Sequence, residues 1–365
     1  MAAPIRVLHI VTYMGRGGLE TLLMNLYRSI DREYIQFDFL VHREFRADYD
    51  DEIEALGGRI YRMPRLNPID PRYNRSLLNF FKTHPEYTVV HSHLDCMSAI
   101  PLAAAKACGV PVRIAHVHSS SQDRNWKYWI KRYYAKKIPA VATNLFACSR
   151  AAGEWMLQGH DFTVLNNGID TDRFSFSPER RAEIRRSLGL GDSLVLGHVG
   201  RFSSVKNHTF LLDIFAHLHK QHPVSKLLLV GDGECRVEIE EKAKTLGLTE
   251  DVVFAGSQSD VSPYYQAMDV FVFPSLYEGL GIVAVEAQTS GLPCVISDKV
   301  PLECAVTDGL VSVQSLENSP QEWAELILSL SVPERKGYAA QVAARGYDIT
   351  GTAKWLQEFY LRIEG

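Results

Sequence analysis

Residues 270–293 read VFVFPSLYEGLGIVAVEAQTSGLP. The first four are apolar and predict a short buried strand, and the glycines at 279 and 281 then open an apolar stretch that predicts a helix. Gly291 and Pro293 mark the end of that helix. A strand that leads through a glycine-containing loop into a helix is the repeating unit of a parallel sheet with helices on both faces.

The same unit recurs along the whole chain. In the first half, strands are expected at 6–11, 37–41, 88–91 and 112–118, and helices at 19–30, 49–56, 97–108 and 125–137. After a polar interval, a second set of strands is expected at 194–199, 226–230, 252–254, 270–273 and 293–297. The pattern predicts an α/β fold with two doubly wound domains, at 1–175 and 190–345, and a terminal helical segment at 346–365.

Composition limits the classes of function. The chain has 365 residues, of which 46% are hydrophobic, and its 39 basic and 43 acidic side chains give a net charge of −4. This length suffices for two domains, each with its own core. The near balance of charge excludes a strongly basic nucleic-acid binder, so no nucleic-acid partner is expected, and the hydrophobic content excludes a disordered chain.

The sequence also indicates a compartment. No apolar run approaches the roughly 20 residues that cross a bilayer, and the first residues lack the pattern of a signal peptide. The six cysteines show no Cys-x-x-Cys pair and no zinc-site spacing, as expected of small buried residues in a reducing compartment. We therefore expect a cytoplasmic protein that contacts a membrane at most peripherally, at its inner face.

Two loops that follow strands carry groups suited to phosphate. The segment 15–20, after the first strand, contains paired glycines whose N–H groups can face an anion, although its spacing is not that of a dinucleotide fingerprint and a plain tight turn would look the same. After the first strand of the second domain, Arg201 and Lys206 stand five residues apart. A guanidinium fork and an ammonium group at that spacing can clamp a diphosphate, and two solvated surface cations are the alternative.

Two carboxylates lie near the start of the helix that residues 270–293 predict. Glu278 precedes its first turn, and Glu286 follows eight residues later, about two turns into the helix. At this spacing both can point to one side and accept hydrogen bonds from the several hydroxyls of a sugar. The apolar neighbours of Glu286 argue against a solvated surface residue.

These segments together resemble a known family. Gly-Gly-Leu-Glu at 17–20, Asn-Gly-Ile-Asp at 167–170, Gly-Arg-x4-Lys-Asn at 200–207, Gly-Asp-Gly at 231–233 and Glu-Gly-Leu-Gly-x4-Glu-Ala at 278–287 occur in the order found in glycosyltransferase family 4. The resemblance covers nearly the whole chain and is closest to the capsular and exopolysaccharide branch. It implies a GT-B fold, in which two Rossmann-like domains face a central cleft.

The resemblance further implies a reaction. It is the retaining, metal-independent transfer of a sugar from a nucleotide-sugar donor, with UDP the expected nucleotide, to a glycan or lipid-linked acceptor. The expected partners are therefore this donor and this acceptor, and neither a cofactor nor a metal is expected.

The resemblance also implies roles for individual residues. Arg201 and Lys206 would hold the donor diphosphate, Glu278 the transferred sugar, and Glu286 the ribose. Further donor contacts are implied for the backbone of Gly17, Gly18, Gly279, Leu280, Gly281 and Ile282, and for Gly256, Ser257 and Gln258 beside the base. The expected catalytic residues are Arg201, Lys206 and Glu278, together with a histidine of the cleft.

Histidines follow two strands of the first domain, at 91 and 93 and at 116 and 118. His116 and His118 share one face of a strand, and His118 lies nearer the carboxyl end, where ligands of such sheets bind. By the resemblance, His118 best matches the histidine that touches the transferred sugar. His116 is the alternative, and a purely structural histidine is the third interpretation.

Two Asp-x-Asp patterns, at 48–50 and 170–172, are of the kind with which other glycosyltransferases hold metal ions. The first lies in an acidic helix start, where carboxylates favour the helix N-terminus, and the second lies between the two domains. Metal binding is therefore not expected at either.

The stretch 124–137 contains six cations, five aromatic residues and no acid. In a helix, an apolar stripe would be flanked by cations. The stripe comprises Trp126, Trp129, Ile130 and Tyr133, and the cations expected to face a membrane are Lys131, Arg132, Lys136 and Lys137. This pattern is typical of a helix on an anionic membrane surface, close to a lipid-linked acceptor, and the alternative is a helix that packs its stripe on its own domain.

The segment 352–363 predicts one amphipathic helix. By the resemblance it crosses back to the first domain, and a surface cap fits the sequence equally well. The alternatives to sugar transfer are a sugar-nucleotide epimerase of the GT-B fold, a noncatalytic sugar-nucleotide-binding partner of a membrane assembly complex, and a nicotinamide oxidoreductase. The glycine spacing disfavours the last of these.

Overall fold

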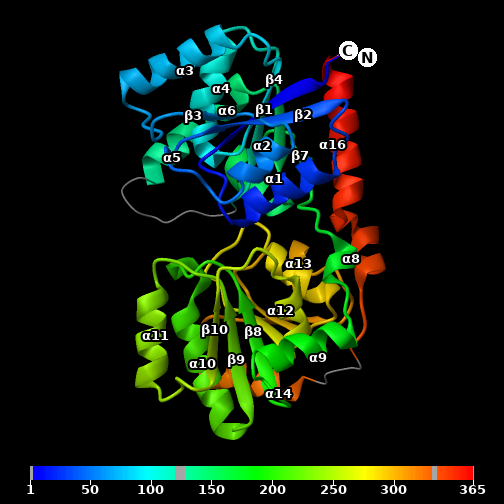
Figure 1. The fold of residues 1–365 in the computed structure, drawn as a ribbon. Coiled ribbons are helices and arrows are strands. Elements are labelled where there is room, and N and C mark those ends of the chain that lie inside the picture. Colours follow the sequence, from blue (N-terminus) through cyan, green and yellow to red (C-terminus); the bar gives the residue numbers. More distant parts are fainter. Residues whose placement is uncertain (1–2, 120–127, 331–334, 365) are drawn as a thin grey trace. The chain divides into compact units, whose positions relative to one another are not determined.

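The computed structural model describes residues 3–119, 128–330 and 335–364, and the chain forms two compact units (Figure 1). Unit 1 comprises Met1–Ile169 and Gly346–Gly365, and unit 2 comprises Asp170–Arg345. Each unit has a parallel sheet, and the strand orders are those of doubly wound folds. The predicted α/β class with two doubly wound sheets is confirmed.

Unit 1 alternates strands with helices. Its strands are β1 (Ile5–Val11), β2 (Ile35–Val41), β3 (Ile60–Arg62), β4 (Val89–Ser92), β5 (Val112–Val117), β6 (Asn144–Ala147) and β7 (Thr163–Val164). Its helices are α1 (Gly18–Ser29), α2 (Asp50–Ala55), α3 (Pro71–Thr83), α4 (Ala99–Ala107), α5 (Tyr128–Ala135), α6 (Ile138–Val141), α7 (Arg150–Leu157) and α16 (Ile349–Glu364), with a 3-10 turn, η1 (Asp95–Ser98). The strand order is β3-β2-β1-β4-β5-β6-β7.

The terminal helix α16 packs on unit 1. Its Leu356, Phe359 and Tyr360 are buried in one apolar cluster with side chains of β1 and α1. The Gln357 side chain accepts a hydrogen bond from the N–H of Asp31 at 2.8 Å. The amphipathic helix expected at 352–363 is therefore present, and its apolar face covers the sheet of unit 1.

Unit 2 repeats the same alternation. Its strands are β8 (Leu194–Val199), β9 (Ser225–Val230), β10 (Val252–Gly256), β11 (Val270–Phe273), β12 (Cys294–Ser297) and β13 (Val311–Gln314). Its helices are α8 (Thr171–Phe174), α9 (Pro178–Ser187), α10 (His208–Gln221), α11 (Arg236–Thr245), α12 (Ser262–Ala267), α13 (Ile282–Thr289), α14 (Pro320–Ser329) and α15 (Ala339–Val342), with two 3-10 turns, η2 (Ser204–Lys206) and η3 (Leu302–Cys304). The strand order is β10-β9-β8-β11-β12-β13.

The first boundary between the units lies at Ile169. Asp170 caps α8 by accepting a hydrogen bond from the N–H of Arg173 at 3.0 Å. Phe174 packs against Tyr265, with ring centres 5.8 Å apart, and its carbonyl accepts a hydrogen bond from Ser290. Residues 170–175, which the sequence places in the first domain, thus pack within unit 2, because capping and aromatic contacts hold them there.

The sequence does not predict β3, β6, β7 and β13. In the sheets, β3, β7 and β13 are edge strands, and β7 consists of two exposed residues. An edge strand has a partner on one side only and needs fewer apolar residues, so its periodic signal is weak. The helix expected at 97–108 divides into η1 and α4, and the one expected at 125–137 is described from Tyr128 onward.

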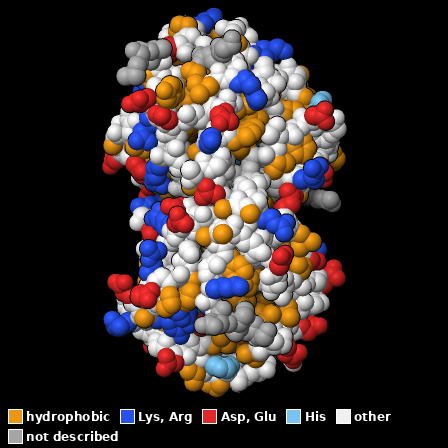
Figure 2. Space-filling model, turned by 90° about the vertical axis from the view of Figure 1, so that its right-hand side faces the viewer, with side chains coloured by type: hydrophobic (Ala, Val, Ile, Leu, Met, Phe, Trp, Pro, Cys, Tyr) orange, Lys and Arg blue, Asp and Glu red, His pale blue; other side chains and the backbone are white. Residues whose placement is uncertain are grey.

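The surface agrees with the near balance of charge. On the face shown in Figure 2, acidic and basic side chains are interspersed rather than gathered into one patch. Among the described helices, none combines the length and the apolar character that a bilayer span requires. The six cysteines are free thiols, and Cys96, Cys148, Cys294 and Cys304 are buried, as the sequence suggests.

Candidate functional site

Each sheet has a switch point, where the chain leaves two adjacent strands in opposite directions. In unit 2 these strands are β8 and β11, and in unit 1 they are β1 and β4. Ligands of doubly wound sheets bind at the carboxyl ends of the strands beside such a point. In unit 2, the two loops that leave β8 and β11 contain Arg201, Lys206 and Glu278.

The structure brings Lys206 and Glu278 together. The Nζ atom of Lys206 donates to Oε1 of Glu278 at 2.6 Å, and the two side chains are only 18% and 12% exposed. Nζ also lies 5.0 Å from the ring centre of Phe273, the last residue of β11. A pair so shielded from water interacts more strongly than a surface pair, and removal of one partner leaves the other charge largely buried.

Backbone contacts fix these two loops to each other. The N–H of Leu276 donates to the carbonyl of Val205 at 2.8 Å, and the side-chain amide of Asn207 donates to the carbonyl of Pro274 at 3.2 Å. Asn207 has a φ of 56°, a left-handed conformation that asparagine adopts more readily than most residues. The main chain therefore positions Lys206 opposite Glu278.

A third loop closes against the one that carries Arg201. A Cβ atom on Gly231 would lie 2.0 Å from the carbonyl oxygen of Gly200, and one on Gly233 would lie 2.4 Å from the carbonyl oxygen of Phe202. Neither position accepts a side chain without a shift of the backbone. Close approach of two main chains therefore explains the Gly-Asp-Gly motif.

Arg201 does not join the Lys206–Glu278 pair. Its guanidinium group lies 2.9 Å from the carboxylate of Glu234, and its side chain is 66% exposed. An exposed pair of this kind contributes about 0–1 kcal/mol, so it opposes a turn of Arg201 toward an anion only weakly.

The N-terminus of α13 belongs to the same loop as Glu278. Gly281 precedes the helix with a φ of 86°, and a Cβ there would lie 3.1 Å from both Phe273 and Val300. Leu280 is buried, Gly279 is half-buried, and Ile282 begins the helix. The first N–H groups of a helix lack intrahelical acceptors and carry the positive end of its dipole, so this loop favours an anion.

Glu286 lies on α13 in a buried position. The hydroxyl of Tyr265 donates to its Oε2 at 2.7 Å. Burial raises the pKa of Glu286 to about 7, and the hydrogen bond from Tyr265 opposes this increase. The carboxylate is therefore poised between its two protonation states near neutral pH. Tyr265 was not singled out in the sequence, because its contact depends on the packing of α12 against α13.

Gly256, Ser257 and Gln258 follow β10. Gly256 has a φ of 69°, Ser257 is exposed, and the side-chain amide of Gln258 donates back to the carbonyl of Ala255 at 2.5 Å. The loop is thus held by its own contacts, and the role expected for it beside a base stays a prediction.

In unit 1, the paired glycines mark the start of α1. Gly17 is the cap residue and Gly18 the first helical residue, so the helix opens where the sequence predicts it. A Cβ atom on Gly17 would lie 2.3 Å from the carboxylate of Glu20. The carboxylate of Glu20 therefore lies over Gly17, at the start of α1.

The two histidine pairs of unit 1 converge. Nδ1 of His93 lies 3.1 Å from Nε2 of His118, and Nε2 of His93 lies 3.0 Å from Nδ1 of His9. The backbone N–H of His118 donates to Asp95 at 2.7 Å. Burial lowers the pKa of His118 to about 4, and the carboxylate of Asp95 opposes this decrease. His116 lies beside His118, with ring centres 4.1 Å apart.

His118 is thus neutral at neutral pH and is held at the carboxyl end of β5, as its position in the sequence indicates. Contact with a sugar stays a prediction. His9 and Asp95 were not singled out in the sequence, since only the order of the strands shows that they approach His93 and His118.

The Asp-x-Asp patterns have structural contacts. Asp50 is buried and accepts hydrogen bonds from the N–H of Ala47 at 3.1 Å and from Arg62 at 2.5 Å. Asp170 caps α8, as described above. Ion pairing and helix capping therefore account for these two residues.

The basic aromatic stretch forms α5, and Trp126 lies outside the described residues. Trp129 and Tyr133 are 76% and 56% exposed, and Ile130 is also exposed. The half-buried and buried positions of the helix are Tyr128, Lys131, Arg132, Tyr134 and Ala135. The described part of the apolar stripe therefore points to solvent rather than onto the domain.

The cations of this stretch differ in their exposure to solvent. Lys136 and Lys137 are exposed, and Nζ of Lys137 lies 4.1 Å from the ring centre of Tyr133. Lys131 and Arg132 are half-buried, and Arg132 donates to the carbonyl of Trp155 on α7 at 3.2 Å. Arg132 is held against unit 1, so Lys136 and Lys137 are better placed to meet an external surface.

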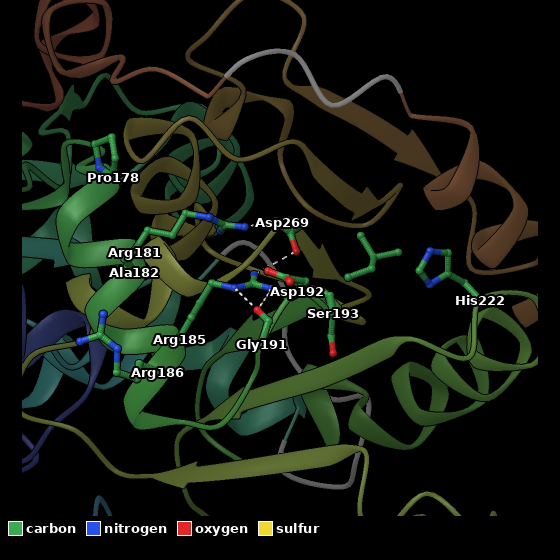
Figure 3. Close-up of a pocket in the computed structure, with 11 residues that line it drawn as sticks. Pro178, Arg181, Ala182, Arg185, Arg186, Gly191, Asp192, Ser193, His222 and Asp269 are labelled. Carbon is green, nitrogen blue, oxygen red and sulfur yellow. Dashed lines mark hydrogen bonds and ion pairs between the residues drawn. The ribbon is translucent and has the colours of Figure 1, made fainter.

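A cavity of about 740 Å³ in unit 2 lies elsewhere, beside α9 (Figure 3). Leu194, which begins β8, and Asp269, which precedes β11, line it, so it lies at the amino ends of these strands. Arg181 and Arg185 pair with Asp269 at 2.6 and 3.2 Å, and Arg185 also donates to the carbonyl of Gly191. These contacts fasten α9 to the sheet, and the cavity is not the candidate donor site.

Comparison with known proteins agrees with this arrangement. Residues 16–173 match the family described as Glycosyltransferase Family 4, and residues 180–342 match the family described as Glycosyl transferases group 1. A protein of Bacillus subtilis (strain 168) named glycosyltransferase EpsF is 39% identical over 356 residues, which are 94% of this chain and 93% of that protein. The capsular polysaccharide biosynthesis glycosyltransferase CapH of Staphylococcus aureus is 26% identical over 372 residues, which cover 98% and 99% of the two chains.

A solved structure shares the fold. The crystal structure of Anabaena Alr3699/HepE in complex with UDP and glucose superposes with a TM-score of 0.81 over 98% of this chain and 99% of that one, at 20% sequence identity. The two doubly wound units are thus of the GT-B type, which confirms the fold that the resemblance implies.

Proposed function

The chain belongs to the glycosyltransferases of group 1 and family 4, and on that premise we propose the details of its reaction. It is a glycosyltransferase with relatives in polysaccharide biosynthesis. The proposed donor is a UDP-sugar, and the proposed acceptor is a glycan on a lipid carrier. Transfer retains the anomeric configuration and needs no metal ion.

The observation that carries the proposal is the shielded contact between Lys206 and Glu278. It joins the loops that follow β8 and β11, at the switch point of unit 2, beside the N-terminus of α13. A cation, a carboxylate and a helix N-terminus side by side suit a ligand with both phosphates and hydroxyls. A nucleotide-sugar is such a ligand, and HepE was solved with UDP and glucose bound.

In transfer, the bond between the anomeric carbon and a phosphate oxygen breaks, and UDP leaves with the electron pair. Lys206 and the start of α13 stabilise the negative charge that develops on the diphosphate, and Arg201 joins them after it releases Glu234. With this charge neutralised by the chain itself, transfer proceeds without a bound cation.

The acceptor hydroxyl forms the new bond on the face that the diphosphate leaves. Its proton passes to a phosphate oxygen of the leaving group, so the anomeric configuration is retained. Glu278 and His118 hold hydroxyls of the transferred sugar, and Glu286 accepts hydrogen bonds from the ribose.

The proposed acceptor agrees with the outward face of α5. Trp129 and Tyr133 expose aromatic rings beside Lys136 and Lys137. Such a helix lies on an anionic bilayer with its rings at the headgroups. The chain would then work at the inner face of the membrane and meet a lipid-linked glycan there.

The test is nucleotide release with a panel of UDP-, GDP- and ADP-sugars, with and without a chelator. We expect stabilisation against heat by one UDP-sugar, slow hydrolysis that the chelator does not abolish, and, once an acceptor is found, a product with the anomeric configuration of the donor by NMR. An inverted product would refute retention. An epimerised sugar formed without acceptor would refute transfer as the primary reaction.

A further inference from the structure

Five histidine side chains meet on one face of the unit 1 sheet. They come from β1 and from the ends of β4 and β5, which are neighbours in the sheet. The set is His9, His91, His93, His116 and His118, and the ring centres of successive pairs lie between 4.1 and 5.4 Å apart. Removal of so many polar rings from water costs free energy unless their nitrogens find partners.

Several of these nitrogens have no such partner. Among the described residues, both ring nitrogens of His116, Nδ1 of His118, and Nε2 of both His9 and His91 are buried without a hydrogen bond. Folded proteins leave few buried polar atoms unpaired, and a bound ion is one of the usual ways in which such atoms are satisfied. Both nitrogens of His116 thus lack a partner beside His93 and His118, whose Nδ1 and Nε2 atoms contact each other.

Three of the five are arranged as ligands. His93, His116 and His118 each offer a ring nitrogen within 4.8 Å of the other two. Nδ1 of His93 and Nε2 of His118 are 3.1 Å apart, and two ligands of a tetrahedral zinc ion with bonds of about 2.0–2.1 Å are about 3.3 Å apart. We propose that His93, His116 and His118 form a binding site for one transition-metal cation of the Zn²⁺ type.

The surroundings of the three rings suit this ion. Burial lowers the pKa of His93 and His116 well below its usual range, so both imidazoles are neutral and can bind a cation at neutral pH. With a cation on Nδ1 of His93, its Nε2–H donates to Nδ1 of His9 at 3.0 Å. Metal-binding histidines are commonly oriented by such a hydrogen bond from the second nitrogen.

Asp95 supplies negative charge beside the three rings. It accepts hydrogen bonds from the N–H of His118 and the hydroxyl of Ser119, both at 2.7 Å. Together with His93 it lines a cavity of about 370 Å³, which gives an ion a route to the site. Arg43 and Arg65 also line this cavity and lower the affinity for a cation, and Asp95 offsets part of their charge.

The donor atoms define which ions fit. Imidazole nitrogen suits Zn²⁺, Co²⁺, Ni²⁺ and Cu²⁺, whereas Mg²⁺ and Ca²⁺ prefer oxygen. His9, His91 and His93 also lie within ligand distance of one another. In that trio, however, Nδ1 of His91 is already bonded to the hydroxyl of Tyr360 at 2.7 Å, and we therefore assign the ion to the trio beside Asp95.

The site has a consequence for transfer that rests on the proposed function. A cation there occupies Nε2 of His118, the residue proposed to hold the sugar. We therefore expect the ion to inhibit transfer, in contrast to a catalytic metal. Binding itself does not depend on this role.

The experiment titrates the full chain, freed of metal with a chelator, with Co²⁺ and follows the visible absorption of the bound ion. Zn²⁺ then displaces it in competition. We expect one ion per chain, a Zn²⁺ dissociation constant below about 1 µM, and no displacement by millimolar Mg²⁺. Absence of saturable binding would overturn the proposal.

Variants locate the ion. His116→Gln loses no hydrogen bond in the described part of the chain, and should weaken Zn²⁺ binding at least about tenfold, since even residues that only orient ligands have effects of that size. His93→Gln should do the same and guards against misfolding of the first variant. The exposed His160 gives the control His160→Gln, which should bind as the parent does.

His91 belongs only to the trio of His9, His91 and His93. His91→Gln should therefore leave the affinity for Zn²⁺ unchanged. An equal loss in His91→Gln and His116→Gln would refute the assigned ligands. Transfer assays with added Zn²⁺ form a separate arm. If Zn²⁺ binds without inhibiting transfer, the metal site is supported and the proposed role of His118 in holding the sugar is refuted. If transfer is normal and no ion binds, only the metal site is refuted.

Discussion

The two units have the same strand order around their switch points but place different chemistry there. The first strand of each carries a histidine at its fifth position, His9 in β1 and His198 in β8. In unit 1 the neighbouring strand β4 adds His91, and His93 follows its end. In unit 2 the neighbouring strand adds Phe271 and Phe273, and the loops that follow β8 and β11 add the charged pair of Lys206 and Glu278.

The comparison shows that topology fixes where a site forms, whereas a few side chains fix its electrostatics. Unit 1 buries imidazoles that are neutral, because burial lowers their pKa. Unit 2 shields the Lys206–Glu278 ion pair from water, and it buries Glu286 with a raised pKa. Unit 1 should therefore be the more sensitive to acid, and unit 2 the more sensitive to the removal of a charged side chain.

The largest expected difference is in acid. Burial lowers the pKa of His9 to about 3 and of His118 to about 4, and it lowers those of His91, His93 and His116 well below the usual range. In the unfolded chain these residues bind protons below about pH 6.5, so the stability of unit 1 falls as the pH drops below that value. Each histidine contributes up to about 1.4 kcal/mol per pH unit.

Unit 2 has fewer such groups, since burial lowers the pKa of His198 to about 4 and of His208 to about 2. Hydrogen exchange measured from pH 7.5 to 5.5, corrected for the intrinsic rates, should show protection lost earlier in β1, β4 and β5 than in β8 and β11. Loss of protection at the same pH in both units would contradict the expected difference between them. His116→Phe should reduce the pH dependence of the stability of unit 1 by the contribution of one histidine.

The next effect concerns the charged pair of unit 2. Lys206→Ala removes the cation expected on the leaving diphosphate, together with its ion pair to Glu278. We expect the activation free energy to rise by about 1–3 kcal/mol, so that kcat falls roughly 5- to 150-fold. Nucleotide release measures this change.

The matched control is Lys242→Ala. Lys242 also pairs with a carboxylate, that of Asp213, at 2.6 Å, but on the outer helices α11 and α10. It should change kcat by less than about twofold, since surface pairs contribute little. Equal kcat in Lys206→Ala and the parent would remove Lys206 from the proposed mechanism.

A smaller effect is expected at Glu286. Its pKa of about 7 means that the carboxylate ionises between pH 6 and 8, and the ionised form is the better acceptor for ribose hydroxyls. The donor dissociation constant, measured by calorimetry, should therefore decrease as the pH rises through 7.

Two variants sharpen this prediction. Glu286→Gln should bind the donor more weakly and without this pH dependence. Tyr265→Phe removes the hydrogen bond that lowers the pKa of Glu286, so its profile should shift to higher pH. An unchanged profile in both variants would exclude Glu286 from the donor site.

The smallest effect is expected on the surface of unit 1. Lys136→Glu combined with Lys137→Glu should weaken binding to vesicles that contain phosphatidylserine, by about 1 kcal/mol for each lost basic residue and more for the reversed sign. Sedimentation with the vesicles measures this. Lys354→Glu, at an exposed position of α16 in the same unit, is the control. Equal sedimentation of both variants would leave α5 without a membrane role.

Local patterns were sufficient for much of the fold. The strands expected at 194–199 and 270–273 occur with those bounds, and α13 begins at Ile282, directly after the glycine that opens it. Apolar runs and helix-ending glycines are short-range signals that the chain carries without reference to its partners. The edge strands β3, β7 and β13 were missed because little of their surface needs to be apolar.

The candidate site was less accessible from the sequence. Arg201, Lys206 and Glu278 could be named from spacing and resemblance, but spacing did not show that Arg201 pairs with Glu234 while Lys206 contacts Glu278. The stripe of α5 was expected on chemical grounds, yet only the packing of the helix showed that Trp129 and Tyr133 face outward.

Local patterns in the sequence specify two doubly wound sheets and the loops that hold cations, carboxylates and glycines. Which of these groups come into contact depends on the tertiary structure. Lys206 and Glu278 are separated by 72 positions, and His9 and His93 by 84. Groups so far apart come into contact because the crossover helices of a parallel sheet return each strand beside a distant one, and no local pattern specifies the resulting neighbours.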